Sequence, residues 1–296
     1  IHIPGHIYPY FISGSNGKLV WVEEKPDPRW ENRSFSVIKI LDLKQGKTRQ
    51  LSFRSRYLAA SLSYDGRYIA AVENTINNYN SLVVLNASNG DVLDKIPAPE
   101  NAYLQRPQWS QTSSDISVVF LSGAGEGIMS YSVDSKRWKT LLNPSRNDLQ
   151  SASLRNDSLF FVSSSSGTDN IYVLAPDKSI SNLTNSKYGA YDPCLVEGKV
   201  IFSDYSFSGY NICETEIKGA SADTVNEGKN SSFLINRFDT VKIKTNFQTI
   251  TGYKPVPYRK AGHLFRFHSW MPFYADLEKI QSDPTSIRPG FTVMSQ

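Results

Sequence analysis

The sequence has few of the residues on which metal, redox and disulfide sites depend. Its 296 residues include 2 Cys, 3 Met and 4 His. Two cysteines are too few for a disulfide framework or a Cys-based zinc site. We expect Cys194 and Cys213 to be reduced, buried thiols. A disulfide bond between them is the alternative in an oxidising compartment. The histidines do not form a His-Glu-x-x-His string, and neither a metal nor a cofactor is predicted.

Long hydrophobic runs are also missing. The longest apolar stretches, such as residues 68–72, are far shorter than a membrane-spanning helix, so no such helix is predicted. The sequence opens with Ile1 instead of Met and shows no basic segment followed by an apolar one. We therefore expect this chain to be a piece of a longer protein.

The excess of positive charge is confined to one part of the chain. The net charge is +4, and six basic residues lie between residues 239 and 276 without an acidic neighbour, so the remainder carries 4 − 6 = −2. The six are Lys242, Lys244, Lys254, Arg259, Lys260 and Arg266. A nucleic-acid-binding protein would carry a basic stripe on its main domain, and none is predicted here. A basic, aromatic tail suits an anionic surface or a protein partner better.

What the sequence does contain is a repeat. A small polar turn followed by a hydrophobic strand recurs with anchors at Gly17, Gly66, Asp115, Asp157 and Gly198, which are 49, 49, 42 and 41 residues apart. Gly and Asp suit such turns because they tolerate positive φ. A period of about 40–50 residues is typical of a β-propeller.

Further strands accompany each anchor. A strand is predicted after the anchors at residues 36–40, 81–85, 127–131, 170–174 and 210–214, and inner strands are predicted before them at residues 8–11, 106–110 and 191–195. With a short edge strand, each unit has the four strands of a propeller blade. The sequence therefore predicts an all-β propeller of four-stranded blades, five of them recognisable, followed by an irregular C-terminal extension.

Three motifs carry a family resemblance. Residues 107–110, residues 63–70, and residues 170–173 with 182–184 resemble the Pro-x-Trp-Ser, Asp-Gly-x-x-Ile-Ala, Ile-Tyr and Leu-Thr elements of the TolB-like (WD40-like) β-propeller repeat. The resemblance spans about residues 6–217 and concerns turns and packing between blades. Because such propellers commonly have six blades, it implies a sixth, assembled from residues 232–235 and 246–250. A ring of five blades is the alternative.

The C-terminal region is a different kind of sequence. We expect residues 1–217 to form the propeller, residues 218–252 a linker with possible closing strands, and residues 253–296 a basic aromatic extension. That extension resembles the segment that joins a TolB-like propeller to an outer-membrane β-barrel in Bacteroidetes-type surface proteins. The resemblance implies that Arg259, Lys260, Arg266 and Trp270 face a membrane or a partner. A lid packed under the propeller is the alternative.

Catalytic motifs are absent from the sequence. The repeats resemble, more distantly, the propellers of prolyl oligopeptidase-class peptidases, but no Gly-x-Ser-x-Gly elbow occurs. The serine-rich residues 163–167 and 206–209 are predicted to be loops between the second and third strands of their blades. The glycine-rich residues 122–127 precede another strand, so a hairpin loop is predicted instead of a phosphate-binding loop. We expect no enzyme activity.

A binding surface is the remaining prediction. In a propeller, the loops after the second strands and the connections between blades lie on one face. Tyr, Trp and Arg on that face are the residue types that dominate protein interfaces. The candidates are Trp30, Arg33, Arg54, Arg56, Tyr79, Tyr103 and Tyr205. The expected function is non-catalytic recognition of a protein or ligand by a bacterial envelope protein, at the periplasmic side of the outer membrane. The alternatives are the gating propeller of a peptidase with an external catalytic domain, and a glycan-binding propeller.

Overall fold

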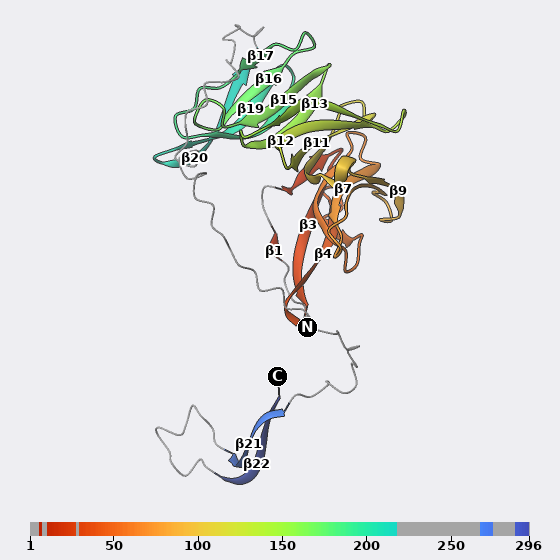
Figure 1. Ribbon diagram of the computed structural model, residues 1–296, viewed down its shortest axis with the longest axis vertical. Coiled ribbons are helices and arrows are strands. Elements are labelled where there is room, and N and C mark those ends of the chain that lie inside the picture. Colours follow the sequence, from red (N-terminus) through yellow and green to blue (C-terminus); the bar gives the residue numbers. More distant parts are fainter. Residues whose placement is uncertain (1–5, 8–10, 28–29, 218–266, 275–287, 296) are drawn as a thin grey trace, which may run out of the picture. The chain divides into compact units, whose positions relative to one another are not determined.

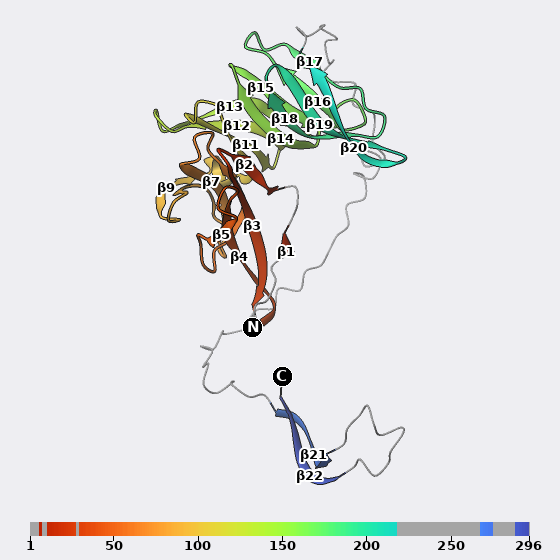
Figure 2. The same ribbon diagram turned by 180° about the vertical axis from the view of Figure 1, so that it is seen from behind.

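The computed structural model describes residues 6–7, 11–27, 30–217, 267–274 and 288–295, with only the backbone for residues 30–32, 267–268, 274 and 294–295. The chain divides into two compact units, Ile1–Lys229 and Asn230–Gln296. The first unit contains five antiparallel sheets that follow one another along the chain (Figures 1 and 2). They are the five blades of a β-propeller, as the repeat predicted.

Each blade runs from its inner strand outward in chain order. The first contains β2 (Ser13–Ser15), β3 (Lys18–Asp27), β4 (Trp30–Asp42) and β5 (Lys47–Gln50), with β1 (His6–Ile7) paired to the far end of β3; the second contains β6 (Tyr57–Leu62), β7 (Tyr68–Asn74), β8 (Asn80–Asn86) and β9 (Val92–Pro97). The short 3-10 helix η2 (Pro99–Asn101) leads into the third blade.

The later blades repeat this order. The third contains β10 (Tyr103–Trp109), β11 (Asp115–Ser122), β12 (Gly125–Ser132) and β13 (Arg137–Ser145); the fourth contains β14 (Leu149–Arg155), β15 (Ser158–Ser163), β16 (Asn170–Leu174) and β17 (Ile180–Asn182); the fifth contains β18 (Ala190–Val196), β19 (Lys199–Ser206) and β20 (Gly209–Glu216). Residues 232–235 and 246–250, which we expected to build a sixth blade, lie outside the described residues.

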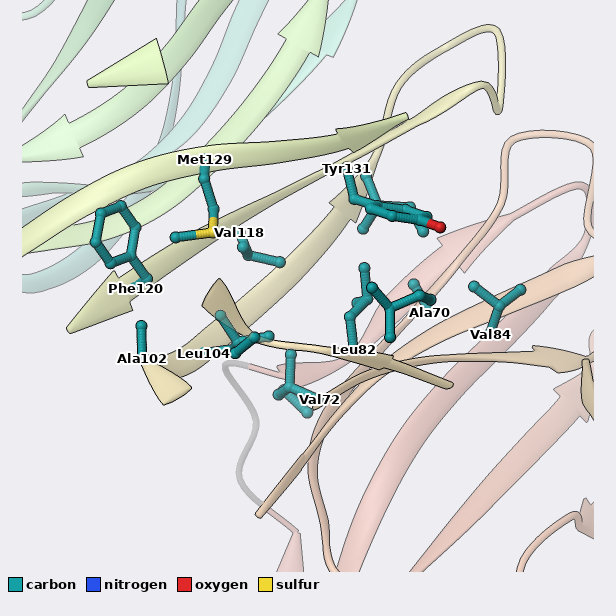
Figure 3. Packing of buried hydrophobic residues seen from close by; sticks show 14 of the residues in the cluster. Ala70, Val72, Leu82, Val84, Ala102, Leu104, Val118, Phe120, Met129 and Tyr131 are labelled. Atoms are coloured by element: carbon teal, nitrogen blue, oxygen red, sulfur yellow. The ribbon is translucent and has the colours of Figure 1, made fainter. Parts of the chain in front are cut away.

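The middle strands of the second, third and fourth blades are largely buried because each of these blades lies between two others. All seven residues of β8 except the last are buried, and four consecutive residues of β7 are buried as well. Figure 3 shows the core between the second and third blades, where Leu82 and Val72 meet Leu104 and Met129. Similar clusters join the first blade to the second, the third to the fourth and the fourth to the fifth.

The inner strands are irregular in a consistent way. β6, β10, β14 and β18 each shift register against the next strand, between Tyr57 and Ala59, Gln105 and Gln108, Leu149 and Ser151, and Tyr191 and Cys194. Such a bulge bends the strand and redirects a side chain. In the first blade the inner strand is Ser13–Ser15, so the expectation of a strand at residues 8–11 is wrong for Phe11, which precedes it.

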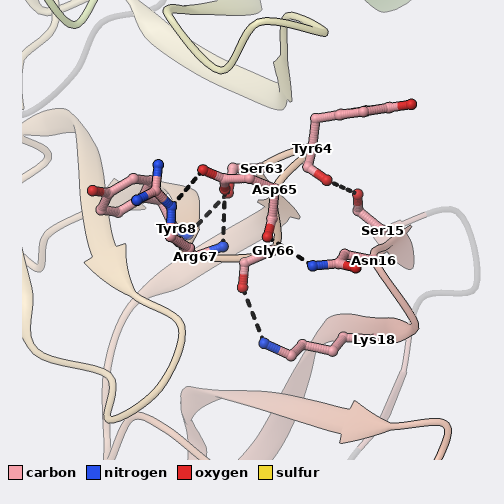
Figure 4. Close-up of polar contacts among 9 residues, drawn as sticks. All are labelled: Ser15, Asn16, Lys18, Ser63, Tyr64, Asp65, Gly66, Arg67 and Tyr68. Carbon is pink, nitrogen blue, oxygen red and sulfur yellow. Dashed lines mark hydrogen bonds and ion pairs between the residues drawn. The ribbon is translucent and has the colours of Figure 1, made fainter.

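Polar contacts join the turns of neighbouring blades. Ser15 Oγ, Asn16 Nδ2 and Lys18 Nζ donate hydrogen bonds to the carbonyl oxygens of Tyr64, Asp65 and Gly66, at 2.7, 2.9 and 3.2 Å (Figure 4). These are the turns that carry the first two repeat anchors. The sequence repeat is therefore also a contact between equivalent turns.

The cysteines differ from expectation in one respect. Cys194 on β18 and Cys213 on β20 are separated by β19, as predicted. Cys194 is exposed and Cys213 is half-buried, so the expectation of buried thiols is wrong. The reasons are that Cys194 lines a cavity formed by the inner strands and that Cys213 lies on β20, where no residue is fully buried.

The second unit contains an antiparallel pair, β21 (Phe267–Tyr274) and β22 (Arg288–Ser295). Pro272 and Pro289 fit there because both strands of a two-stranded sheet are edge strands. The rings of Trp270 and Phe291 stack with centroids 5.7 Å apart, and both are exposed. Within the described part of the chain, no helix is long and apolar enough to cross a membrane.

Candidate binding site

We define the loop face as the end of the blades that carries the second-to-third strand loops and the connections between blades. In antiparallel blades, the end of each second strand and the start of the next inner strand lie at this same end. Hydrogen bonds link the two kinds of loop. Asn101, just before β10, accepts a bond from the Asn80 backbone N–H at 2.8 Å, and its amide donates to the Asn78 carbonyl at 2.8 Å.

The same linkage recurs around the loop face. The Leu149 backbone N–H donates to Glu126 Oε2 at 2.8 Å, and Gln150 Nε2 donates to Asp169 Oδ2 at 3.0 Å. The first bond joins the start of the inner strand β14 to the start of β12 in the preceding blade, and the second joins β14 to the loop between β15 and β16 of its own blade. The loop face is therefore a hydrogen-bonded framework, on which side chains can be held in place.

Large apolar and aromatic side chains are exposed on this framework. Phe53 is 77% exposed, Tyr79 is 65% exposed and Phe207 is 98% exposed. The further exposed members are Ile76, Tyr103, Tyr188 and Tyr205. Exposed apolar side chains gathered on one face are typical of interaction sites.

Five of the predicted binding residues lie on this face with exposed side chains, namely Arg54, Arg56, Tyr79, Tyr103 and Tyr205. The Arg54 guanidinium lies 5.5 Å from the Phe35 ring centroid and 5.8 Å from that of Phe53. Arg56 Nε donates to the Asn74 carbonyl at 3.0 Å. These contacts orient both guanidinium groups at the connection from the first blade to the second.

Two other candidates lie on β4, at the loop-face end of the first blade. Trp30 begins the strand, and its side chain is outside the described atoms. Arg33 has an exposed side chain whose Nε lies 4.0 Å from Asp27 Oδ2. Of the tail candidates, Arg259, Lys260 and Arg266 are outside the described residues, and Trp270 belongs to the second unit.

A second feature, absent from the sequence predictions, is a cavity along the propeller axis. Its volume is about 400 Å³, and residues from the inner-strand regions of all five blades line it. The lining that matters chemically is Phe11, Tyr64, Arg106, Ser151, Arg155 and Asp192. We call this cavity the central channel.

Two arginines reach across the central channel to aromatic rings. The Arg106 guanidinium of the third blade lies 5.4 Å from the Phe11 ring centroid beside the first blade. The Arg155 guanidinium of the fourth blade lies 5.9 Å from the Tyr64 ring centroid of the second. Figure 4 shows the Tyr64 side chain extending away from the Asp65–Arg67 pair of its own turn. Both contacts therefore skip one blade.

One acidic group shares the channel wall. Asp192 lies in the bulge of β18, as Arg106 lies in the bulge of β10. Desolvation raises the pKa of Asp192 above its ordinary value, and the charge of Arg106 opposes that rise. Both residues have positive φ, +51° and +43°, and each precedes a proline. The prolines that follow these two residues could have indicated the bulges from the sequence, because proline inside a strand is found at bulges. In both strands the residue before the proline lines the channel.

Similarity to known proteins rests on structure. No protein-family model and no curated protein matches the sequence. TolB from Acinetobacter baumannii superposes with a TM-score of 0.55 and 17% identity, over 72% of this chain and 53% of that one. The putative TolB of Agrobacterium tumefaciens superposes with a TM-score of 0.56 and 17% identity, over 75% of this chain and 81% of that one. The chain has the TolB β-propeller fold.

The TolB β-propeller fold is shared with other proteins as well. A puromycin hydrolase superposes with a TM-score of 0.50 and 12% identity, over 68% of this chain and 34% of that protein. This chain covers about half the length of the Acinetobacter TolB. In the described part of the TolB-like propeller, no group of three or more His, Cys, Asp or Glu side chains is placed to hold a metal ion.

Proposed function

We propose that this chain is a non-catalytic recognition module of a bacterial cell-envelope protein, and that it binds a protein partner through its loop face in the periplasm. The observation that carries the proposal is the concentration of exposed aromatic and arginine side chains on that face. Phe53, Tyr79 and Phe207 together offer a large apolar area on three different blades. The fold shared with two TolB proteins supports the envelope assignment.

The chemistry of these side chains favours a protein partner. Tyr and Phe supply rigid area with few rotatable bonds, and Arg supplies directional donors. Arg54 illustrates both, since its guanidinium lies near the Phe35 and Phe53 rings while its side chain stays exposed. Such a cluster can act as an anchor that fills a pocket on the partner.

A photo-cross-linking experiment tests this proposal in the source cells. A photoreactive phenylalanine analogue is placed at Tyr79, at Phe53 and, as a control, at Leu93 on the edge strand β9 of the second blade. Tyr79 is 65% exposed and Leu93 is 52% exposed, so the two positions are similarly accessible. We expect one adduct of the same mass from Tyr79 and Phe53, and none from Leu93.

The matched variant combines Arg54→Gln, Arg56→Gln and Tyr79→Ala. All three side chains are exposed, so the melting temperature should be unchanged while the Phe53 adduct disappears. Equal adducts from Leu93 and Tyr79, or an adduct that survives the triple replacement, would refute recognition by the loop face.

The location and the tail belong to the same proposal. We propose a periplasmic location, with Arg259, Lys260, Arg266 and Trp270 directed toward the outer membrane or a partner. Exposed Trp and Phe beside cationic groups suit a membrane interface, and Trp270 and Phe291 are exposed and stacked. Cell fractionation followed by immunoblotting tests this: the chain is expected in the periplasmic or outer-membrane fraction, and a cytoplasmic band would contradict it.

A further inference from the structure

The two arginines of the central channel have unused hydrogen-bonding capacity. Within the described residues, neither Arg106 nor Arg155 has a carboxylate within ion-pair distance, and neither guanidinium has a hydrogen-bond acceptor. A guanidinium presents five N–H donors in a planar fork. The channel therefore holds two cationic groups that are ready to accept an anion.

The arginines lie at two depths of the channel. Arg155 ends β14 and pairs with Ser158, the residue after the repeat anchor Asp157. Arg106 lies three residues before Trp109, which pairs with Ile116, the residue after the anchor Asp115. At ~3.3 Å per residue, three residues span at most about 10 Å along the strand. A ligand that meets both guanidinium groups therefore needs acidic groups at two points along the channel.

The wall between these depths is polar and partly unsatisfied. Ser151 Oγ is buried and has no hydrogen-bond partner among the described residues. Ser13, Ser153, Gln108 and Gln111 add hydroxyl and amide groups to the same wall. A buried hydroxyl without a partner is costly, and a ligand oxygen would satisfy it.

The charge of the lining favours an anion. Among the described residues that line the channel, Asp192 is the one acidic side chain, against two arginines. Phe11 and Tyr64 hold the guanidinium groups over their rings without using the N–H donors. This arrangement reduces the conformational freedom that each arginine would lose on binding.

We propose that the central channel is a binding site for a polycarboxylate, with one carboxylate on Arg106 and another on Arg155. The volume of about 400 Å³ lies within the range of ligand sites, roughly 300–1,000 Å³. The carboxylates can belong to a free polycarboxylic acid or to an acidic polypeptide segment. This site is separate from the loop face, so the proposal does not depend on the proposed function.

Calorimetric titration of the full 296-residue chain tests the proposal. The probes are citrate, tetraglutamate and, as an uncharged control of the same length, tetraglutamine. We expect tetraglutamate to bind and tetraglutamine not to bind. Arg106→Gln and Arg155→Gln should each weaken binding at least tenfold, because each removes a charge-assisted bidentate contact. Arg137→Gln, on the exposed edge strand of the third blade, should leave it unchanged.

Citrate distinguishes the two sources of carboxylate. Binding of citrate with the same arginine dependence, at equal or higher affinity than tetraglutamate, assigns a free acid as the ligand. Preference for tetraglutamate assigns a polypeptide segment. Binding of neither probe, or binding unchanged in both arginine variants, overturns the proposal.

A second measurement guards against a variant that fails to fold. In a Cys213→Ser background, Cys194 is the remaining thiol, and it lines the channel. Negatively and positively charged methanethiosulfonates of similar size are compared on it. The ratio of their rates should favour the anionic reagent. It should fall at least threefold in the double variant Arg106→Gln, Arg155→Gln, relative to Arg155→Lys, which keeps the positive charge. An unchanged ratio would contradict an anion-attracting channel.

Discussion

Asn16 and Asp65 occupy the same position in successive repeats, 49 residues apart, and they touch. The Asn16 side-chain amide donates to the Asp65 carbonyl oxygen at 2.9 Å. Gly66 follows, with φ +71°, and a Cβ there would lie 3.1 Å from Asn16 Cβ. Glycine at position 66 therefore serves two purposes. It allows the positive φ of its own turn, and it leaves room for Asn16 in the turn of the preceding blade.

Gly66→Ala should therefore destabilise more than Gly17→Ala. Both glycines have positive φ, but a Cβ at Gly17 meets nothing within 4 Å. The backbone penalty, about 1 kcal/mol, is common to both. Contact with Asn16 should add roughly another 1 kcal/mol for Gly66. Urea denaturation measures both, and equal losses would show that the contact with Asn16 has no energetic weight.

Glu23→Gln should destabilise the first blade at neutral pH. Glu23 is 5% exposed; its carboxylate lies 2.8 Å from Lys39 Nζ and accepts a bond from Trp21 Nε1 at 3.1 Å. Desolvation alone would raise the pKa of Glu23, but the hydrogen bonds from Lys39 and Trp21 lower it below its ordinary value of 4.5. The loss expected is about 3 kcal/mol, since the half-buried Lys39 loses its carboxylate partner.

The pH dependence has a definite sign for Glu23. With a lowered folded-state pKa, its contribution is present above the unfolded-state value and disappears as the pH falls through the folded-state value. The difference between Glu23→Gln and the native chain should therefore vanish in acid. Glu214→Gln, at the exposed Lys199–Glu214 pair, is the control and should cost less than about 1 kcal/mol. A pH-independent loss at Glu23 would contradict this account.

Asp192→Asn should have the opposite effect. Desolvation raises the pKa of Asp192, so its charged form opposes folding as the pH rises through the folded-state value. Asparagine removes that charge and tolerates the positive φ of +51°. We expect a gain below about 1 kcal/mol at neutral pH, because the side chain reaches water, and no gain below the unfolded-state pKa. Thermal unfolding between pH 3 and 8 measures this, and a loss at neutral pH would refute it.

Tyr172→Phe should stabilise the fourth blade. Tyr172 is 1% exposed, and its hydroxyl has no hydrogen-bond partner among the described residues. Removing a buried, unsatisfied hydroxyl should gain about 1 kcal/mol in denaturation experiments. Tyr172→Leu is the control that separates the effect of the ring from that of the hydroxyl. It also removes the stacking on the Phe161 ring, whose centroid lies 5.7 Å from that of Tyr172, so it should destabilise the protein. A destabilised Tyr172→Phe would indicate a bound water.

The repeat was predictable because its physical causes are local. Gly17, Gly66 and Gly198 lie in turns with positive φ, and the strands after them fill a core that each repeat builds in the same way. The glycine-rich and serine-rich loops were also correctly placed in hairpins, since β11 ends at Ser122 and β12 begins at Gly125. Short-range turn chemistry was enough for these features.

The central channel was not predictable in the same way. Arg106, Arg155 and Asp192 line one cavity only when five inner strands surround one axis. Their spacing in the sequence does not indicate that they lie close together. The first blade shows a related limit, since its inner strand is Ser13–Ser15 and Phe11 lies outside it. The residues that lie on the loop face could be predicted, because the strand order alone determines which loops share one end of a propeller.

Contacts that skip a blade have a consequence for folding. In most repeat architectures each unit touches only its neighbours, so units can unfold in sequence from an end. Arg106 over Phe11 joins the third blade to the segment that begins the first, and Arg155 over Tyr64 joins the fourth to the second. Loss of one blade therefore also removes a contact two blades away, and this should make the propeller unfold in fewer and larger cooperative steps.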